Sequence, residues 1–150
     1  MEIMVKAEIV LMYDDVKLPA YQTSGSAGFD FHAYCPDGNV VIAPGQTKLI
    51  KTGIKMATPL GHELQVRSRS GLALKSQIVV ANSPGTVDSD YRGEIGVILR
   101  NNGTEDYSIS HGDRIAQGVI SPIQQIDKFI VVEELGSTNR GTGGYGSTGV

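Results

Sequence analysis

Short apolar runs separated by closely spaced turn signals are the feature that most constrains the fold of this 150-residue chain. The runs are rich in β-branched residues, and three of them, at 5–11, 62–67 and 94–97, alternate apolar and polar side chains. Further runs occupy 77–81, 115–120 and 129–132, and turn residues stand at 36–39, 43–45, 83–85, 101–103 and 111–113. The pattern predicts an all-β sandwich, jelly roll or barrel, with one short helix at 70–76.

Composition and charge exclude several classes of protein. A net charge of −3 argues against a general nucleic-acid binder, which normally carries a basic face. A single cysteine, Cys35, excludes an intrachain disulfide framework, and the three histidines lack metal-binding spacing. We find neither a transmembrane stretch nor a signal peptide, so we expect one cytoplasmic domain with no membrane partner.

The C-terminal residues 136–150 consist mostly of glycine, serine and threonine. Such a segment cannot bury enough apolar surface to offset the entropy lost on ordering. It nevertheless carries possible phosphate donors in Arg140, Ser147 and Thr148, and a flat aromatic face in Tyr145. We therefore divide the chain into a β domain, 1–135, and a flexible segment, 136–150, that is either a lid over a nucleotide or a plain tail.

A second polar cluster, residues 88–94, packs three carboxylates, a phenol and a guanidinium between the apolar runs 78–80 and 95–98. This placement predicts the tip of a hairpin. A carboxylate such as Asp88 could hold a water molecule and take its proton during hydrolysis. The alternative is a solvated polar hairpin without a catalytic role.

Three further features each allow two interpretations. Residues 67–73 place two arginines and two serines before the expected helix, which fits an anion site or a capped helix with surface arginines. Asp30 lies between Phe29 and Phe31 and should face away from them, either simply exposed or orienting a hydrated metal ion. Arg114 and Gln117 follow a turn and could be structural or functional.

Taken together, these segments resemble the homotrimeric dUTPase family, which carries five ordered sequence motifs. The matching segments of this chain occur in the same order, at residues 27–33, 69–73, 82–93, 112–117 and 140–149. They span nearly the whole chain. The resemblance implies a jelly-roll-like β domain with a flexible glycine-rich C-terminal arm, assembled as a homotrimer whose active sites are shared between subunits.

The resemblance also implies an activity, the hydrolysis of dUTP to dUMP and pyrophosphate with Mg²⁺. Asp88 would be the general base that activates water for attack on the α-phosphorus. Tyr91 would pack under the deoxyribose and exclude a 2′-hydroxyl, and Asp30 would contact the hydrated Mg²⁺. Asn82, with backbone groups of Thr86, Val87 and Gly96, would read the uracil edge.

The remaining implied contacts involve the triphosphate and the far face of the base. The phosphate-binding residues would be Arg69, Ser70, Gly71 and Gln117, joined by Arg140, Ser147 and Thr148 from the lid. Tyr145 would stack on uracil in the place usually held by phenylalanine, and Ser68 stands where the family often has proline. The tyrosine leaves the implied contact possible, because a Tyr ring stacks as a Phe ring does. We expect the serine to matter little.

Two other functions remain open from the sequence. A dCTP deaminase has a related fold, but it would need a catalytic glutamate and would release ammonia. A catalytically idle relative, kept as a regulatory or protein-binding module, would be expected to have lost catalytic positions. Every catalytic position of the dUTPase pattern is filled here, so dUTP hydrolysis is the function we expect.

Overall fold

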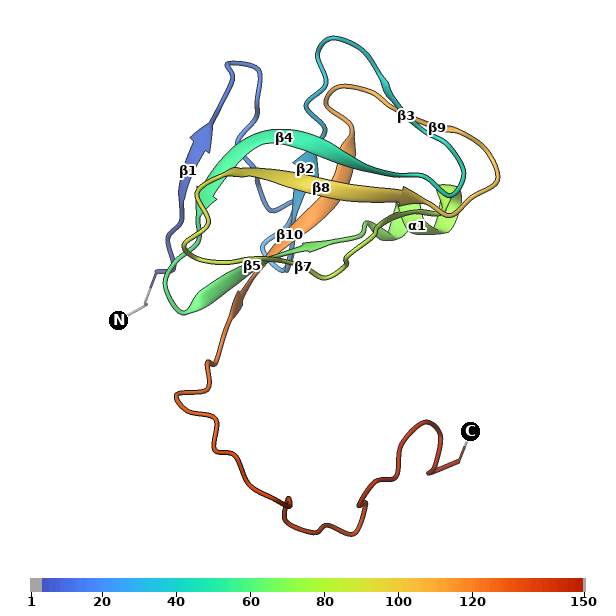
Figure 1. Cartoon of the computed structure of the whole chain (residues 1–150). Helices are drawn as coiled ribbons and strands as arrows, with labels where there is room; N and C mark the ends of the chain where they lie inside the picture. Colours follow the sequence, from blue (N-terminus) through green and yellow to red (C-terminus); the bar gives the residue numbers. More distant parts are fainter. Residues whose placement is uncertain (1–3, 150) are drawn as a thin grey trace.

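Strands and short turns make up most of the computed structural model, which describes residues 4–149 (Figure 1). The strands are β1 (Glu8–Leu11), β2 (Phe29–His32), β3 (Val40–Ile42), β4 (Thr47–Ala57), β5 (His62–Arg67), β6 (Ile78–Val80), β7 (Gly85–Val87), β8 (Glu94–Asn101), β9 (Tyr107–Ile109) and β10 (Arg114–Pro122). The helix α1 (Ser70–Ser76) occupies the segment predicted for it. Within the described residues, no helix has the length and apolar character needed to cross a membrane.

Two four-stranded antiparallel sheets form the body, with orders β1-β4-β8-β6 and β2-β10-β5-β7, and β3 pairs with β9 beside them. The buried side chains of both sheets form one hydrophobic core, which includes Ile50 and Val97 from the first sheet and Phe31, Leu64 and Ile115 from the second. Figure 1 shows β4 and β8 in front of β2 and β10, with β5 below them in this view. The predicted all-β, jelly-roll-like sandwich with one short helix is therefore confirmed.

Strand β2 shows how alternation places a functional side chain. Phe29 and Phe31 are buried and meet edge to face, with ring centroids 5.5 Å apart. Asp30 lies on the opposite face of the strand because successive side chains of a strand point to opposite sides. The sequence-based expectation for its direction is thus correct.

The expected strand at 129–132 is wrong. Residues 123–149, here called the C-terminal arm, contain no strand or helix and extend away from the body (Figure 1). Ile130 and Val131 are 75% and 96% exposed. β-branched composition favours a strand only where a neighbouring strand supplies hydrogen bonds, and among residues 4–149 of this one chain the arm has no such neighbour.

The expected hairpin tip at 88–94 is wrong as well, although its two flanking runs do pair. β6 pairs antiparallel with β8, from Ile78 opposite Asn101 to Val80 opposite Leu99. The chain between them leaves this sheet to form β7, which pairs with β5 in the other sheet. Residues 88–93 therefore connect the two sheets, so the polar cluster lies at a crossing between layers.

Candidate functional site

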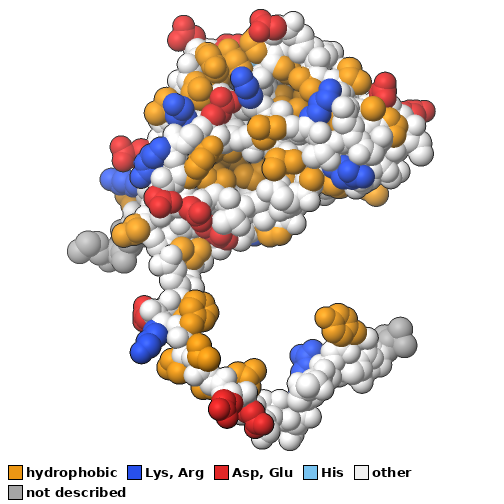
Figure 2. Space-filling view, viewed as in Figure 1, with side chains coloured by type: hydrophobic (Ala, Val, Ile, Leu, Met, Phe, Trp, Pro, Cys, Tyr) orange, Lys and Arg blue, Asp and Glu red, His pale blue; other side chains and the backbone are white. Residues whose placement is uncertain are grey.

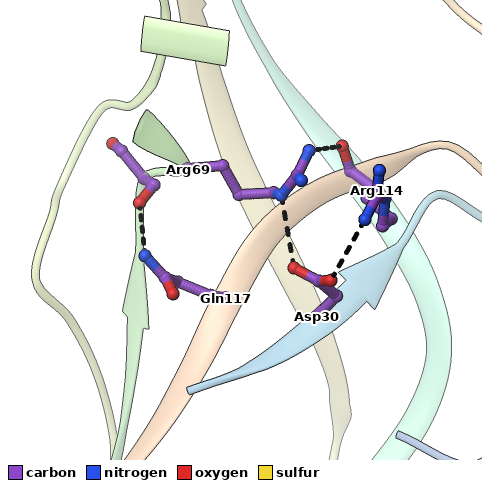
Figure 3. A network of polar contacts seen from close by, with 5 residues as sticks. Asp30, Arg69, Arg114 and Gln117 are labelled. Atoms are coloured by element: carbon purple, nitrogen blue, oxygen red, sulfur yellow. Dashed lines mark hydrogen bonds and ion pairs between the residues drawn. The ribbon is translucent and has the colours of Figure 1, made fainter. Parts of the chain in front are cut away.

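A carboxylate between two guanidinium groups forms the first part of the candidate site (Figure 3). Arg69 Nε lies 3.2 Å from Asp30 Oδ1, and Arg114 Nη1 lies 3.8 Å from Asp30 Oδ2. Arg69 Nη1 also donates to the Arg114 carbonyl at 3.3 Å. Asp30 is 16% exposed, whereas Arg114 is 55% exposed. The pair of arginines therefore forms a positively charged surface that Asp30 balances only in part.

Strand register explains this convergence. Gln117 of β10 lies opposite Asp30 on one side and opposite Arg67 on the other. The chain then turns, so that Arg69 holds the N-cap position of α1, without a side-chain cap, and Ser70 and Gly71 follow on the surface. Gln117 Nε2 donates to the Ser68 carbonyl at 3.0 Å. The four residues implied for phosphate binding, Arg69, Ser70, Gly71 and Gln117, thus gather beside Asp30.

His32, two residues beyond Asp30 on the same strand, has a perturbed titration. Partial burial lowers the pKa of His32 below its ordinary value of 6.5, and the Asp30 carboxylate opposes this shift. Burial disfavours the charged imidazolium because it removes water from around the charge. The ring therefore adds little positive charge to the arginine cluster near neutral pH.

A pocket of about 290 Å³ forms the second part of the candidate site. Five residues implied by the sequence line it, namely Thr86, Val87, Asp88, Tyr91 and Gly96. Its wall also includes Leu49, Glu94, Ile95 and Ile98. Asn82 precedes β7, and its Nδ2 lies close to Gly85, where an added Cβ would be only 3.1 Å away. The pocket therefore gathers Thr86, Val87, Tyr91 and Gly96, which are expected to hold the base and sugar, whereas Asn82 lies beside Gly85 and is not part of the pocket lining.

Strand edges that have no partner strand among the described residues border this pocket. β7 is the last strand of its sheet, and within residues 4–149 it pairs with β5 alone. On β8, the pairing with β6 ends at Leu99, and Ala81 N then donates to the Ile98 carbonyl at 2.8 Å. An edge strand presents backbone N–H and C=O groups to whatever lies beside it. The pocket is consequently lined by main-chain donors and acceptors as well as by side chains.

The third group of expected residues lies elsewhere in this single chain. Arg140, Tyr145, Ser147 and Thr148 belong to the C-terminal arm, which is separate from the body in Figures 1 and 2. Arg140 Nε donates to the Gly143 carbonyl at 2.9 Å, and Tyr145 is fully exposed. One chain therefore brings together the phosphate cluster and, separately, the base pocket, but not the residues of the arm.

Five residues belong to these clusters without having been predicted as site residues, and Ile95 and Ile98 of β8 are two of them. Arg114 contacts Asp30, and its place in the segment 112–117 was a signal that left its role open. Leu49 and Glu94 line the pocket from β4 and β8. Leu49 offers no signal in the sequence, because only the pairing of β4 with β8 brings it beside residues 96 and 98.

Comparison with known proteins identifies the family of this chain. A family model described as dUTPase matches residues 14–149. The chain belongs to the dUTPase family. A deoxyuridine 5'-triphosphate nucleotidohydrolase of Roseobacter denitrificans is 55% identical over 134 residues, covering 89% of this dUTPase and 88% of the relative. One from Helicobacter pylori is 52% identical over 145 residues, covering 97% of each chain.

Solved dUTPase structures agree with the architecture. A Staphylococcus bacteriophage 80alpha dUTPase variant with dUpNHpp superimposes with a TM-score of 0.86 at 26% identity, covering 97% of this dUTPase and 99% of that chain. A variant of the dUTPase from Staphylococcus aureus phage phi11, described with a structural Mg(II) ion, gives a TM-score of 0.78 at 25% identity, with 88% and 99% covered. Together with relatives more than 50% identical, these matches make the chain an enzyme, a dUTP diphosphatase.

Proposed function

We propose that this dUTPase hydrolyses dUTP to dUMP and pyrophosphate by attack of an Asp88-activated water on the α-phosphorus, in the presence of Mg²⁺. One observation carries the proposal. Residues from two sheets and the segment between them, Thr86, Val87, Asp88, Tyr91 and Gly96, line a single pocket of about 290 Å³. The phage 80alpha dUTPase structure with dUpNHpp supports a uracil deoxynucleotide as the ligand.

Uracil recognition follows from the partnerless strand edges of the pocket. Uracil presents an N–H donor between two carbonyl acceptors, and backbone groups of Thr86, Val87 and Gly96 can supply the complement. Asn82 adds a side-chain amide with both a donor and an acceptor. Cytosine reverses one donor–acceptor pair, so its binding would leave polar groups without partners. That mismatch can cost a factor on the order of 10⁴ in discrimination.

Tyr91 selects the sugar. Its ring lines the pocket while its hydroxyl donates to the Glu94 carbonyl at 2.9 Å, which fixes the direction of the ring. A ring packed under a deoxyribose leaves no room for a 2′-hydroxyl. The enzyme should therefore prefer dUTP to UTP.

The triphosphate binds at the arginine cluster, through Arg69, Ser70, Gly71 and Gln117. Within the described residues, no three His, Cys, Asp or Glu side chains group into a metal-binding cage. A single carboxylate with substrate phosphates and water is a common mode of Mg²⁺ binding, and Asp30 provides that carboxylate. Mg²⁺ bound there would neutralise phosphate charge. Since Asp30 already pairs with Arg69, we propose that it contacts the hydrated ion through water.

Asp88 carries the chemical step. It lies directly after β7, is exposed to solvent and lines the base pocket, so a water molecule can reach it. Asp88 takes a proton as the water oxygen bonds to the α-phosphorus. The bond from that phosphorus to the oxygen bridging to the β-phosphate breaks, and pyrophosphate leaves with that oxygen. A deaminase would need a catalytic glutamate, whereas the pocket glutamate, Glu94, accepts a hydrogen bond from Gly53 N at 3.2 Å.

A homotrimer would complete the site. The C-terminal arm exposes apolar side chains that a folded chain normally covers, among them Phe129, Val131 and Leu135 (Figure 2). An apolar groove of about 550 Å³ lies near its exit from the body and is lined by Ile9, Leu18, Met56 and Pro122 among others. We propose that the arm crosses to a neighbouring subunit and closes over the nucleotide there, with Arg140, Tyr145, Ser147 and Thr148 as its contacts. We also propose that the enzyme is cytoplasmic.

Pyrophosphate release, measured in parallel with dUTP, dCTP, dTTP and UTP, tests the proposal. We expect efficient turnover of dUTP alone, with kcat/KM for dCTP and UTP lower by orders of magnitude. Comparable turnover of dCTP and dUTP would remove the assigned uracil recognition. Release of ammonia from dCTP would replace hydrolysis with deamination.

A further inference from the structure

The ring of Tyr91 lies directly against the backbone of Gly93. A Cβ built on Gly93 would lie 2.7 Å from Tyr91 Cζ and 3.2 Å from Cε2, and closer still to the hydroxyl oxygen. Carbon atoms in contact normally keep about 3.5 to 4.0 Å apart. The ring therefore occupies space that any side chain at position 93 would fill.

Backbone conformation does not explain the glycine. The φ angle of Gly93 lies outside the positive range that L-residues avoid, so alanine could adopt the same backbone. The three atoms nearest to a methyl group at this position all belong to the Tyr91 side chain. An alanine at position 93 would therefore act first on the ring.

The ring is also held at its hydroxyl end. Tyr91 Oη donates to the Glu94 carbonyl at 2.9 Å. Glu94 itself is fixed, because its carboxylate accepts from Gly53 N at 3.2 Å and Thr52 Oγ1 donates to the neighbouring Ile95 carbonyl at 2.6 Å. The pairing of β4 with β8 is irregular between Lys51 and Lys55, and both of these donors, Gly53 N and Thr52 Oγ1, belong to this irregular segment. Gly93 and Glu94 together hold a ring that is itself 45% exposed.

We propose that Gly93 is a specificity-determining positioning residue of this enzyme, which sets the plane of the Tyr91 ring and thereby the selection of deoxyribose over ribose. The inference rests on the proposed role of Tyr91 at the sugar. A half-exposed ring without this support could move aside for a 2′-hydroxyl. A ring that packs against the Gly93 backbone and donates a hydrogen bond to the Glu94 carbonyl cannot move aside in this way.

The test is the ratio of kcat/KM for dUTP to kcat/KM for UTP in a double-mutant cycle of Gly93→Ala and Tyr91→Ala. Gly93→Ala should lower the ratio by about tenfold or more, because one methyl-sized displacement in a packed site is worth that much. In the Tyr91→Ala background the same change should alter the ratio by less than about twofold, since the clash is gone. Gly25→Ala is the matched control, because an added Cβ there meets nothing within 4 Å.

Each outcome separates the inference from the function on which it rests. If Tyr91→Ala leaves the ratio unchanged, the sugar role of Tyr91 is wrong and the inference falls with it. If Tyr91→Ala lowers the ratio and Gly93→Ala does not, only the inference is overturned. If Gly93→Ala lowers the melting temperature of the wild type, the same change should not lower the melting temperature of the Tyr91→Ala variant. A loss of stability that persists in the double variant would also overturn the proposal, since Gly93 would then act through something other than the ring.

Discussion

Gly118→Ala should destabilise the body and weaken the site at the same time. Gly118 is buried in β10, opposite Phe29 of β2. An added Cβ would lie 2.7 Å and 2.8 Å from two atoms of the Phe29 ring and 2.8 Å from Phe31 Cε2. Both rings are core residues, 7% and 0% exposed, so neither can turn into solvent to relieve the contact.

The size of the effect follows from two opposing contributions. Overpacking a close-packed core costs about 1–3 kcal/mol. Replacing glycine by alanine at a compatible φ restricts the unfolded chain and stabilises by about 0.4–1 kcal/mol. With each contribution taken near the middle of its range, the net loss in the free energy of unfolding is about 1–2 kcal/mol. For a domain of this size, each kcal/mol lowers the melting temperature by roughly 2–4 °C, so we expect a decrease of about 2–8 °C.

Calorimetry without nucleotide, at one fixed protein concentration, measures this shift. The concentration is fixed because the stability of an oligomer depends on it. Phe29→Leu should be less harmful in the Gly118→Ala background than in the wild type, since the smaller side chain makes room for the methyl group. KM for dUTP should rise, because Asp30 stands between the two displaced phenylalanines. A melting temperature equal to or above that of the wild type would refute the packing argument.

Four further predictions concern the site and the arm. Asp88→Asn should lower kcat by roughly 10² to 10⁴ with little change in nucleotide affinity measured by calorimetry, and wild-type turnover would contradict the role of a base. Asp30→Asn should raise the Mg²⁺ concentration needed for half-maximal activity; an unchanged titration would remove Asp30 from the metal. Truncation after Leu135 should abolish most activity while the melting temperature barely moves, and mixing truncated chains with full-length Asp88→Asn chains should restore some turnover if the arm acts on a neighbour. Because the pKa of His32 is lowered in the folded state, stability should fall as the pH drops below the unfolded value of 6.5, and pH-dependent unfolding of His32→Gln should lack this component.

Local chemistry allowed much of this protein to be predicted from its sequence. The helix at 70–76, the direction of Asp30 and the turns between strands depend on neighbours a few residues apart, and the structure has them where the pattern placed them. The expected site residues Asp88, Tyr91 and Gly96 were close in sequence, and they line one pocket.

Contacts between distant segments were decided only by the tertiary structure. Residues 88–93 were predicted to form a hairpin tip because apolar runs flank them in the sequence. Those runs do pair, as β6 and β8, but the chain between them first forms β7, which pairs with β5 of the other sheet. Residues 129–132 have strand composition and no strand, because a strand needs a partner edge as well as β-branched residues. The arm's apolar side chains stay exposed for the same reason.

The contact between Tyr91 and Gly93 shows most clearly what the sequence could predict and what it could not. The sequence by itself predicted which side chains to expect at the site, because the types and order of residues in a short segment carry that information, and five of these residues line one pocket. It did not determine that the Gly93 backbone and the Glu94 carbonyl hold the ring, or that Leu49 and Arg114 join the site. Those facts depend on strand register and on the path of the chain between two sheets, which only the packing of the whole core fixes.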